Sequence, residues 1–426
     1  MKLIKQTFRF TLAVLLILLM VSGSVNSRPW EPAGRAGVAA NPYLFDYISW
    51  TVQAAWSKLA TANLGISRYL TYAQRRAILG DYLDAYAETK DLRGQIEAIY
   101  ADPNVADPLE SAKTLQQRVE RAEEILDILS PLTEQVVQDQ VSEIIAAAGL
   151  SRFLQPFPPV LYQASELPKN LVLSPRDVIR QEASISLDAD LDLQQIIELE
   201  RQVEAETGFS ALVVPVGGVG SYPTMVIRTN GLAYSYETVA HEWTHNYLTL
   251  RPLGVRYGVS PELRTMNETT ASISGNELSR LLLETFFSIS PEVNEYFSPS
   301  YLVGYTPPMT GNQPEPPAFD YRQEMYNTRL RTEELLSEGK IEDAEAYLEE
   351  RRLVFRENGY QIRRLNQAYF AFHGAYADQP FSAAGADPVG ESVRVLRGRS
   401  RSLADFIRLM SGLKNYRELQ LLVESF

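Results

Sequence analysis

Two of the three histidines in this 426-residue chain lie four positions apart, as His241 and His245, and Glu242 directly follows the first of them. Residues four apart share one face of a helix, which would let both imidazoles reach one metal ion while Glu242 points toward the neighbouring water site. Chance would place three histidines in this way in about one sequence in a thousand. We therefore predict a metal-binding helix, with a surface cluster of polar side chains as the alternative.

The first residues have the features of a targeting segment. Three basic residues among the first nine precede an apolar run from Leu12 to Val21, and small residues follow it as far as Ser27. This pattern predicts a signal peptide or, if it is not cleaved, an N-terminal membrane anchor. The alternative is a buried first helix of the fold, but such a helix would have a polar face, which this run lacks.

Composition narrows the location and the partners of the protein. The chain contains no cysteine, so disulfides, thiolate ligands and cysteine nucleophiles are excluded. An exported chain without disulfides fits a bacterial envelope or secreted protein, and we expect an extracytoplasmic location. Because the formal net charge is −13 and no basic cluster is present, we do not expect the chain to bind nucleic acid.

Hydrophobic patterns separate a helical part of the chain from a mixed part. Apolar residues at helical spacing dominate residues 42–150, with a break near the middle at two Asp-Pro pairs. Short β-rich runs follow and predict a small sheet, and an amphipathic helix from Asp192 to Glu206 lies among them. The predicted strands are Val160–Tyr162, Leu171–Leu173, Ala183–Leu187, Leu212–Val216 and Met225–Arg228.

The segment from Thr238 to Tyr247 resembles the metal-binding helix of the zincin metallopeptidases, which also keep the positions around their two histidines uncharged. The resemblance implies one zinc ion per chain, bound by His241 and His245, and hydrolysis of a peptide bond by a zinc-activated water. It also implies that Glu242 acts as general base and then as general acid. It covers only the stretch from about Ala211 to Leu283.

Zinc needs a third protein ligand, and the following residues distinguish the zincin subgroups. Metzincins would have glycine at position 248 and histidine at 251, whereas this chain has Leu248 and Arg251. The closer resemblance is to gluzincins, whose third ligand is a glutamate on a following helix, and it implies Glu268. Glu277, which like Glu268 directly follows an asparagine, remains the alternative. Nine residues turn a helix by about half a circle, so the two glutamates cannot both face one ion.

One position departs from the thermolysin-like pattern, in which an aspartate four residues after the glutamate ligand orients the first histidine. This chain has Ser272 there, so another residue would have to take that role. The fold expected from the resemblance is α+β, with a small sheet and the histidine helix in a zincin-like catalytic core and helical regions on both sides. The expected parts are a signal peptide or anchor (1–27), a linker (28–41), a helical domain (42–150), the metallopeptidase core (151–290) and a helical C-terminal region (291–426).

Zincins commonly add a tyrosine or histidine that stabilises the oxyanion formed during hydrolysis. Tyr369, His373 and Tyr376 share one face of a helix predicted from Ile362 to Tyr376, and His373 and Tyr369 are the candidates for this role. The alternative is an aromatic stripe in the hydrophobic core that contains a buried histidine.

Substrate binding is also inferred from the family, because zincins usually lay an extended peptide along an edge strand that precedes the metal helix. Met225–Arg228 has that place in the sequence. The glycines at 217, 218 and 220 are expected to form a turn, since no Lys-Ser or Lys-Thr pair follows them as in a phosphate-binding loop. The Gly-x-Met-Glu-Asn motif of a gluzincin aminopeptidase group is absent, so the sequence gives no argument for exopeptidase action.

The function expected from the sequence is therefore zinc-dependent hydrolysis of a peptide or protein substrate by a secreted or membrane-anchored enzyme. An alternative from a different class is a membrane-anchored interaction protein whose zinc site is structural or vestigial. It is motivated by the long helical stretches outside the motif.

Overall fold

The computed structural model describes residues 30–62, 69–101, 105, 107–152, 155–229, 231–287, 319–379 and 383–426. The predicted signal or anchor segment lies outside these residues. The described part is a mixed α+β fold, as predicted, in which helices surround two three-stranded sheets and one two-stranded ribbon. No helix in this part is both long and apolar enough to cross a membrane.

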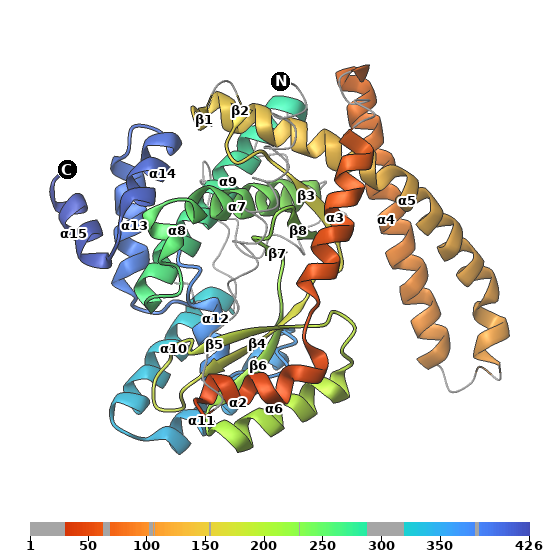
Figure 1. Cartoon of the computed structure of the whole chain (residues 1–426). Coiled ribbons are helices and arrows are strands. Elements are labelled where there is room, and N and C mark those ends of the chain that lie inside the picture. The colour runs from red at the N-terminus through yellow and green to blue at the C-terminus, as the bar shows by residue number, and fades with distance from the viewer. Residues whose placement is uncertain are drawn as a thin grey trace.

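Three helices make up the region predicted as helical before the sheet: α3 (Tyr47–Ala62), α4 (Tyr72–Ala101) and α5 (Pro108–Ala147). Helices α4 and α5 pack along each other as a long hairpin that reaches away from the rest of the molecule (Figure 1). The predicted break separates them. Asp107 caps the start of α5, since its carboxylate accepts a hydrogen bond from the Glu110 backbone.

The segment predicted as a linker instead contains helix α2 (Pro32–Ala40), followed by the 3-10 turn η1 (Asn41–Tyr43). The linker prediction was wrong because the small residues of this segment suit close packing. Ala36 and Ala40 are fully buried in a core that α2 shares with the first sheet and with α6 (Leu193–Thr207).

The first sheet is antiparallel and has the order β5 (Ala183–Leu187), β4 (Lys169–Ser174), β6 (Ser210–Pro215). Its central strand is buried on both faces: Leu171 and Leu173 pack toward α6, and Val172 packs toward α12 (Gln367–His373). Three of the predicted strands therefore form this sheet, and the predicted amphipathic helix α6 covers one of its faces. Asp192 caps α6 through a capping box with Gln195.

The second sheet has the order β3 (Tyr162–Ser165), β8 (Thr224–Ile227), β7 (Gly218–Val219). Strand β8 is parallel to β3 and antiparallel to β7. The expectation that Met225–Arg228 forms the edge strand was therefore wrong, because β8 lies in the centre and β7 forms the edge. A ribbon of β1 (Ser151–Arg152) and β2 (Gln155–Pro156) precedes this sheet.

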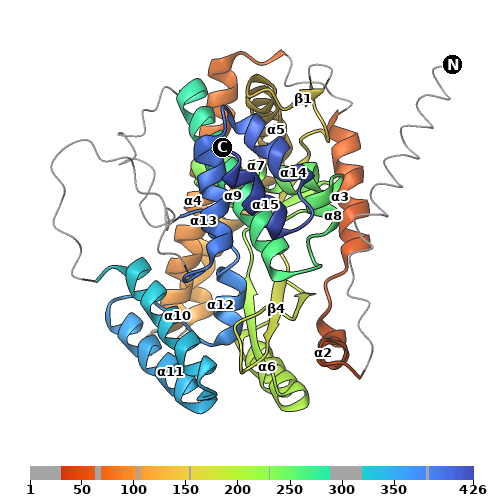
Figure 2. The ribbon, with the colours of Figure 1, turned by 90° about the vertical axis from the view of Figure 1, so that its left-hand side faces the viewer.

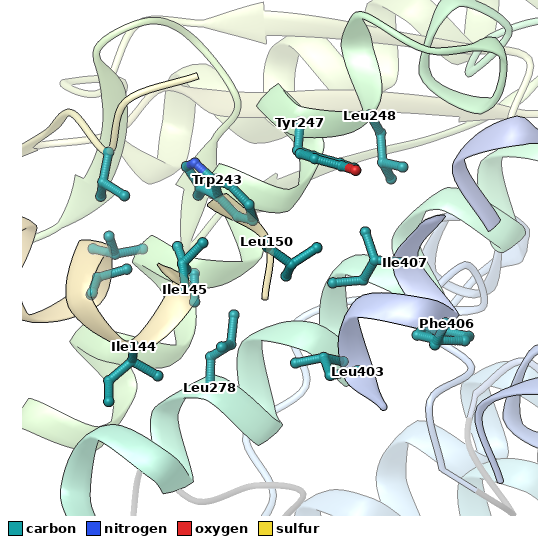
Figure 3. Packing of buried hydrophobic residues seen from close by; sticks show 14 of the residues in the cluster. Ile144, Ile145, Leu150, Trp243, Tyr247, Leu248, Leu278, Leu403, Phe406 and Ile407 are labelled. Carbon is teal, nitrogen blue, oxygen red and sulfur yellow. The ribbon is translucent and has the colours of Figure 1, made fainter. Parts of the chain in front are cut away.

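Helices α7 (Leu232–Thr249) and α9 (Pro261–Phe287) lie side by side in the middle of the molecule, joined by the short α8 (Pro252–Val255) (Figure 1). The back of α7 belongs to the largest hydrophobic core. Figure 3 shows Trp243 and Leu248 packed among side chains from α5, α9 and α14 (Leu403–Gly412). This packing fixes the rotation of α7 about its axis, so that its polar face is turned away from the core.

The C-terminal region is helical, as predicted, and its first hairpin turns at Gly339, whose φ of 74° is in the left-handed region. Helix α12 is shorter than predicted, because the Asn366 side chain accepts a hydrogen bond from the Tyr369 backbone and starts the helix after residue 366. Figure 2 shows the last helices of the chain against the α7 and α9 pair, whereas the first hairpin lies below this pair. The remaining helices are α10 (Tyr321–Ser337), α11 (Ile341–Glu357), α13 (Pro388–Arg399) and α15 (Tyr416–Glu424).

Candidate metal centre

The predicted metal helix is α7, which runs from Leu232 to Thr249. His241 and His245 lie on the same face of this helix, and both side chains keep a small exposed fraction of 15–16%. Glu268 on α9 faces them and is almost fully buried. The structure therefore brings together the three residues that the resemblance to gluzincins implied as ligands.

The three potential ligand atoms have the spacing of a tetrahedral site. The Nε2 atoms of His241 and His245 lie 3.0 Å apart. The Oε2 atom of Glu268 lies 3.6 Å from the first and 3.4 Å from the second. Ligands about 2.0–2.1 Å from a tetrahedral zinc ion are separated from one another by about 3.3 Å. One ion could therefore bind all three atoms with little movement of the side chains.

The Glu268 carboxylate has an unsatisfied oxygen in this place. Its Oε1 atom accepts a hydrogen bond from the Tyr257 hydroxyl, whereas its buried Oε2 atom has no hydrogen-bond partner among the described residues. Burial by itself raises the pKa of Glu268, but the positive charge on His245 and His241 holds that pKa well below its usual range. A buried carboxylate oxygen that lacks a hydrogen bond and lies 3.4–3.6 Å from two imidazole nitrogens is suited to a metal cation.

A hydrogen bond outside the cluster orients the second histidine. The Oδ1 atom of Asn267, which is buried on α9, lies 2.7 Å from Nδ1 of His245. An amide oxygen only accepts hydrogen bonds, so Nδ1 of His245 carries a proton, and Nε2 is the ring nitrogen that faces the centre of the cluster. The Asn267-Glu268 pair thus supplies one potential ligand and one orienting residue.

The alternative ligand, Glu277, lies outside the cluster. Its two carboxylate oxygens accept hydrogen bonds from Nε and Nη2 of Arg397 on α13, each at 2.7 Å. This paired arrangement ties α9 to α13 and leaves the carboxylate occupied. The half-turn of rotation expected between the two glutamates explains why only Glu268 faces the histidines.

Glu242 lies beneath the edge strand β7 and is 6% exposed. A Cβ atom at Gly218 would lie 2.5 Å from Oε1 of Glu242, and one at Gly220 would lie 3.4 Å from Oε2. These glycines were expected to form a turn, but Gly218 lies in β7, and the missing side chains let the strand approach the carboxylate. Burial raises the pKa of Glu242, while the positive charge on the two histidines opposes that rise.

A third glycine lets the two helices approach each other at the cluster. A Cβ atom at Gly275 of α9 would lie 2.7 Å from the Glu237 carbonyl oxygen and 3.1 Å from Cβ of His241. Most of the α9 residues around it are small and buried, among them Thr269, Ala271 and Ser274. Close packing of α7 on α9 therefore depends on this small surface, which brings Glu268 within reach of both histidines.

Of the three aromatic residues predicted on one helix face, Tyr376 lies nearest to the potential ligands. Its ring lies against His241, with centroids 6.3 Å apart and planes at 29°. Tyr369 instead turns its hydroxyl to Tyr321, at 3.1 Å between the two oxygens. The two tyrosines, which were expected to share one face of a helix, are directed differently because α12 ends at His373.

His373 lies among aromatic rings, with centroids 4.3 Å from Tyr369 and 5.1 Å from Phe372. Burial lowers the pKa of His373 to about 4, and the nearby positive charge of Arg264 lowers it further. The imidazole is therefore neutral at physiological pH. Its surroundings match the aromatic core stripe that the sequence offered as the alternative.

Two carboxylates that the sequence did not indicate act electrostatically on His241. Burial and the charge of Asp378 raise the pKa of Glu237 to about 7, and the positive charge of His241 opposes this rise. The pKa of Asp378 is also raised, by burial, and again opposed by His241. Glu237 lies one turn before His241, a spacing that could have suggested it, whereas Asp378 is 137 residues away and gives no such signal.

No family model matches this chain, and comparisons with curated proteins and with solved structures find no significant match. Two imidazoles that each keep a small exposed fraction and one buried carboxylate are a ligand set suited to zinc or a similar divalent metal.

Proposed function

We propose that this chain is a zinc-dependent peptidase of the zincin type, most similar to gluzincins, with one zinc ion bound by His241, His245 and Glu268. The observation that carries the proposal is the buried Oε2 atom of Glu268, which has no hydrogen-bond partner among the described residues and lies 3.4–3.6 Å from two imidazole nitrogens. When bound, zinc would supply a Lewis acid that makes a water molecule nucleophilic near neutral pH.

Glu242 would take the proton of the attacking water and later donate it to the departing amine. Its raised pKa, caused mainly by burial, suits a carboxylate that must accept and release a proton. Tyr376, beside His241, is better placed than Tyr369 or His373 to donate a hydrogen bond to the developing oxyanion. An extended peptide would add to the free edge of β7, directly above Glu242.

The arrangement of elements supports a zincin-like core. The edge strand β7 passes over the metal helix α7, and the following helix α9 supplies the third ligand. A targeting segment at residues 1–27 would bring such an enzyme out of the cytoplasm, as a secreted or membrane-anchored protein.

The test is cleavage of a peptide library by zinc-loaded protein, with and without chelator, and the same assay on Glu242→Gln. We expect chelator-sensitive cleavage by the wild-type chain, and loss of cleavage in Glu242→Gln with zinc content unchanged. Glu277→Gln is the matched control and should cleave normally, because Glu277 pairs only with Arg397 in the described structure. Cleavage that survives in Glu242→Gln would refute the proposed role.

The second candidate is a membrane-anchored interaction protein with a structural or vestigial zinc site. It is favoured by the α4 and α5 hairpin, which reaches away from the site and exposes large apolar side chains such as Leu109 and Ile128. Stoichiometric zinc without any chelator-sensitive product from the library would support this candidate over the peptidase.

A further inference from the structure

Arg264 connects the metal centre to the chain segment that carries Tyr376. It lies on α9 one turn before Glu268, and its guanidinium points toward the end of α12. Nη1 donates to the Ala371 carbonyl oxygen at 2.9 Å, and Nη2 donates to the Phe372 carbonyl oxygen at 3.4 Å. A cation near the last carbonyls of a helix also interacts favourably with the helix dipole.

The same guanidinium reaches the glutamate ligand through a tyrosine. The charge of Arg264 acts on both Tyr257 and Glu268, and the Tyr257 hydroxyl donates its proton to Oε1 of Glu268. Because Oε1 is held in this way, Oε2 is the oxygen that turns toward His241 and His245. The orientation of the carboxylate thus depends on the Tyr257 hydroxyl, which lies within the field of the Arg264 guanidinium.

A second tether from α9 holds the segment after α12. The Thr269 Oγ1 atom lies 3.4 Å from the Ala375 carbonyl oxygen and 3.4 Å from the Ala377 backbone nitrogen. These two contacts enclose Tyr376, whose ring lies against His241. Arg264 and Thr269 therefore attach residues 371–377 to the helix that also carries Glu268.

We propose that Arg264 is a positioning residue that sets two parts of the site at once: the orientation of Glu268, through Tyr257, and the position of Tyr376, through the end of α12. The first part concerns metal binding alone. The second part rests on the proposed peptidase function, because it assigns a role to Tyr376 in the reaction.

The metal-binding part is tested by measuring zinc affinity, in competition with a chelator, for Arg264→Lys, Tyr257→Phe and the double variant. Loss of a residue that orients a metal ligand typically weakens binding by about 10- to 100-fold, and we expect a loss of this size in each single variant. Because the two residues act in series, the double variant should bind zinc no more weakly than the weaker single variant. Additive losses, or single variants with unchanged affinity, would overturn the proposal.

Arg397→Lys is the matched control, since Arg397 also binds a glutamate of α9 but on the side away from the histidines. It should leave zinc affinity unchanged. The visible absorption of the cobalt-substituted proteins provides a readout that a simple loss of folding stability would not change. The absorption spectrum should shift in Arg264→Lys and in Tyr257→Phe. It should stay constant in Arg397→Lys. If Arg264→Lys does not fold, Tyr257→Phe carries both measurements.

The second part is tested by kinetics on zinc-saturated enzyme. Arg264→Lys should lower kcat more than Tyr257→Phe does, because only Arg264 also contacts the end of α12. Equal kcat values for the two variants would overturn this part. If the wild-type protein binds zinc but cleaves nothing, the proposed function fails, while the affinity and cobalt measurements still decide the first part.

Discussion

Two buried glutamates in this molecule have opposite environments. Glu200, on α6 beside the first sheet, is fully satisfied: Oε1 accepts from the Val213 backbone at 2.7 Å and from Arg363 at 2.5 Å, and Oε2 accepts from Arg363 at 2.8 Å. Glu268, in the metal centre, is equally buried, but only its Oε1 atom receives a hydrogen bond from the described residues.

The difference distinguishes a structural carboxylate from one that needs a ligand. Burying a charge without partners is unfavourable. At Glu200, arginines of the same chain pair with the carboxylate and offset this loss of hydration. The Glu268 region offers two imidazoles whose Nε2 atoms converge on the free oxygen, and a cation would complete it. The following predictions test this contrast, in order of decreasing expected effect.

The largest effect should come from Glu268→Gln. Zinc binding to a four-ligand site totals about 10–16 kcal/mol, or roughly 2.5–4 kcal/mol per ligand, so zinc affinity should fall by roughly 70- to 900-fold. Glu277→Gln, on the same helix, should bind zinc like the wild type. Chelator competition measures both affinities, and equal losses in the two variants would break the contrast between them.

The next effect concerns the arginine-bound carboxylate. Glu200→Gln leaves Arg363 without its main partner, and removing one member of a buried ion pair should lower the free energy of unfolding by about 3 kcal/mol. Its zinc affinity should be unchanged, since Glu200 lies outside the metal cluster. Urea unfolding of the apo-protein measures the free energy of unfolding, and the zinc competition assay measures the affinity. A Glu200→Gln protein with an unchanged free energy of unfolding would show that the ion pair between Glu200 and Arg363 does not stabilise the fold.

A smaller effect is expected where α7 and α9 touch. A Cβ atom at Gly275 has no room beside the Glu237 carbonyl oxygen, so Gly275→Ala should lower the free energy of unfolding by about 2 kcal/mol and also weaken zinc binding. Gly94→Ala in α4 is the control, because nothing described lies within 4 Å of its Cβ position. It should stabilise the protein by about 0.5–1 kcal/mol. Zinc affinity that is insensitive to Gly275→Ala would contradict a role for this close approach.

The smallest effect concerns His373 and pH. The pKa of His373 is about 4 in the folded chain and about 6.5 when unfolded, so the unfolded chain binds an extra proton below pH 6.5. Stability is therefore lost as the pH falls from 6.5 toward 4. Between pH 7 and 5.5 the wild type should lose about 1 kcal/mol more than His373→Gln. Parallel stability curves for the two proteins over this range would contradict a buried, neutral His373.

Local rules identified most of the elements that hold the site. The resemblance to gluzincins implied a glutamate ligand on a helix after the two histidines, and Glu268 lies on such a helix, α9. The β-rich runs predicted all three strands of the first sheet. These features depend on residues a few positions apart, which is where sequence patterns are informative.

The remaining parts of the site depend on pairing between distant residues. The order of the second sheet made β7 its edge, although its glycines suggested only a turn. Tyr376 lies against His241 because α12 ends early and the following segment is held by Arg264 and Thr269. Sequence spacing carries no information about such long-range contacts.

The central claim is that His241, His245 and Glu268 together bind one zinc ion, and X-ray absorption at the zinc edge of the purified protein tests it most directly. We predict one zinc per chain with two imidazole nitrogens and oxygen ligands at about 2.0–2.1 Å, and no sulfur. In Glu268→Gln this coordination shell should change. A shell made only of oxygen atoms, or a protein that retains no zinc although it was never exposed to chelator, would contradict the claim.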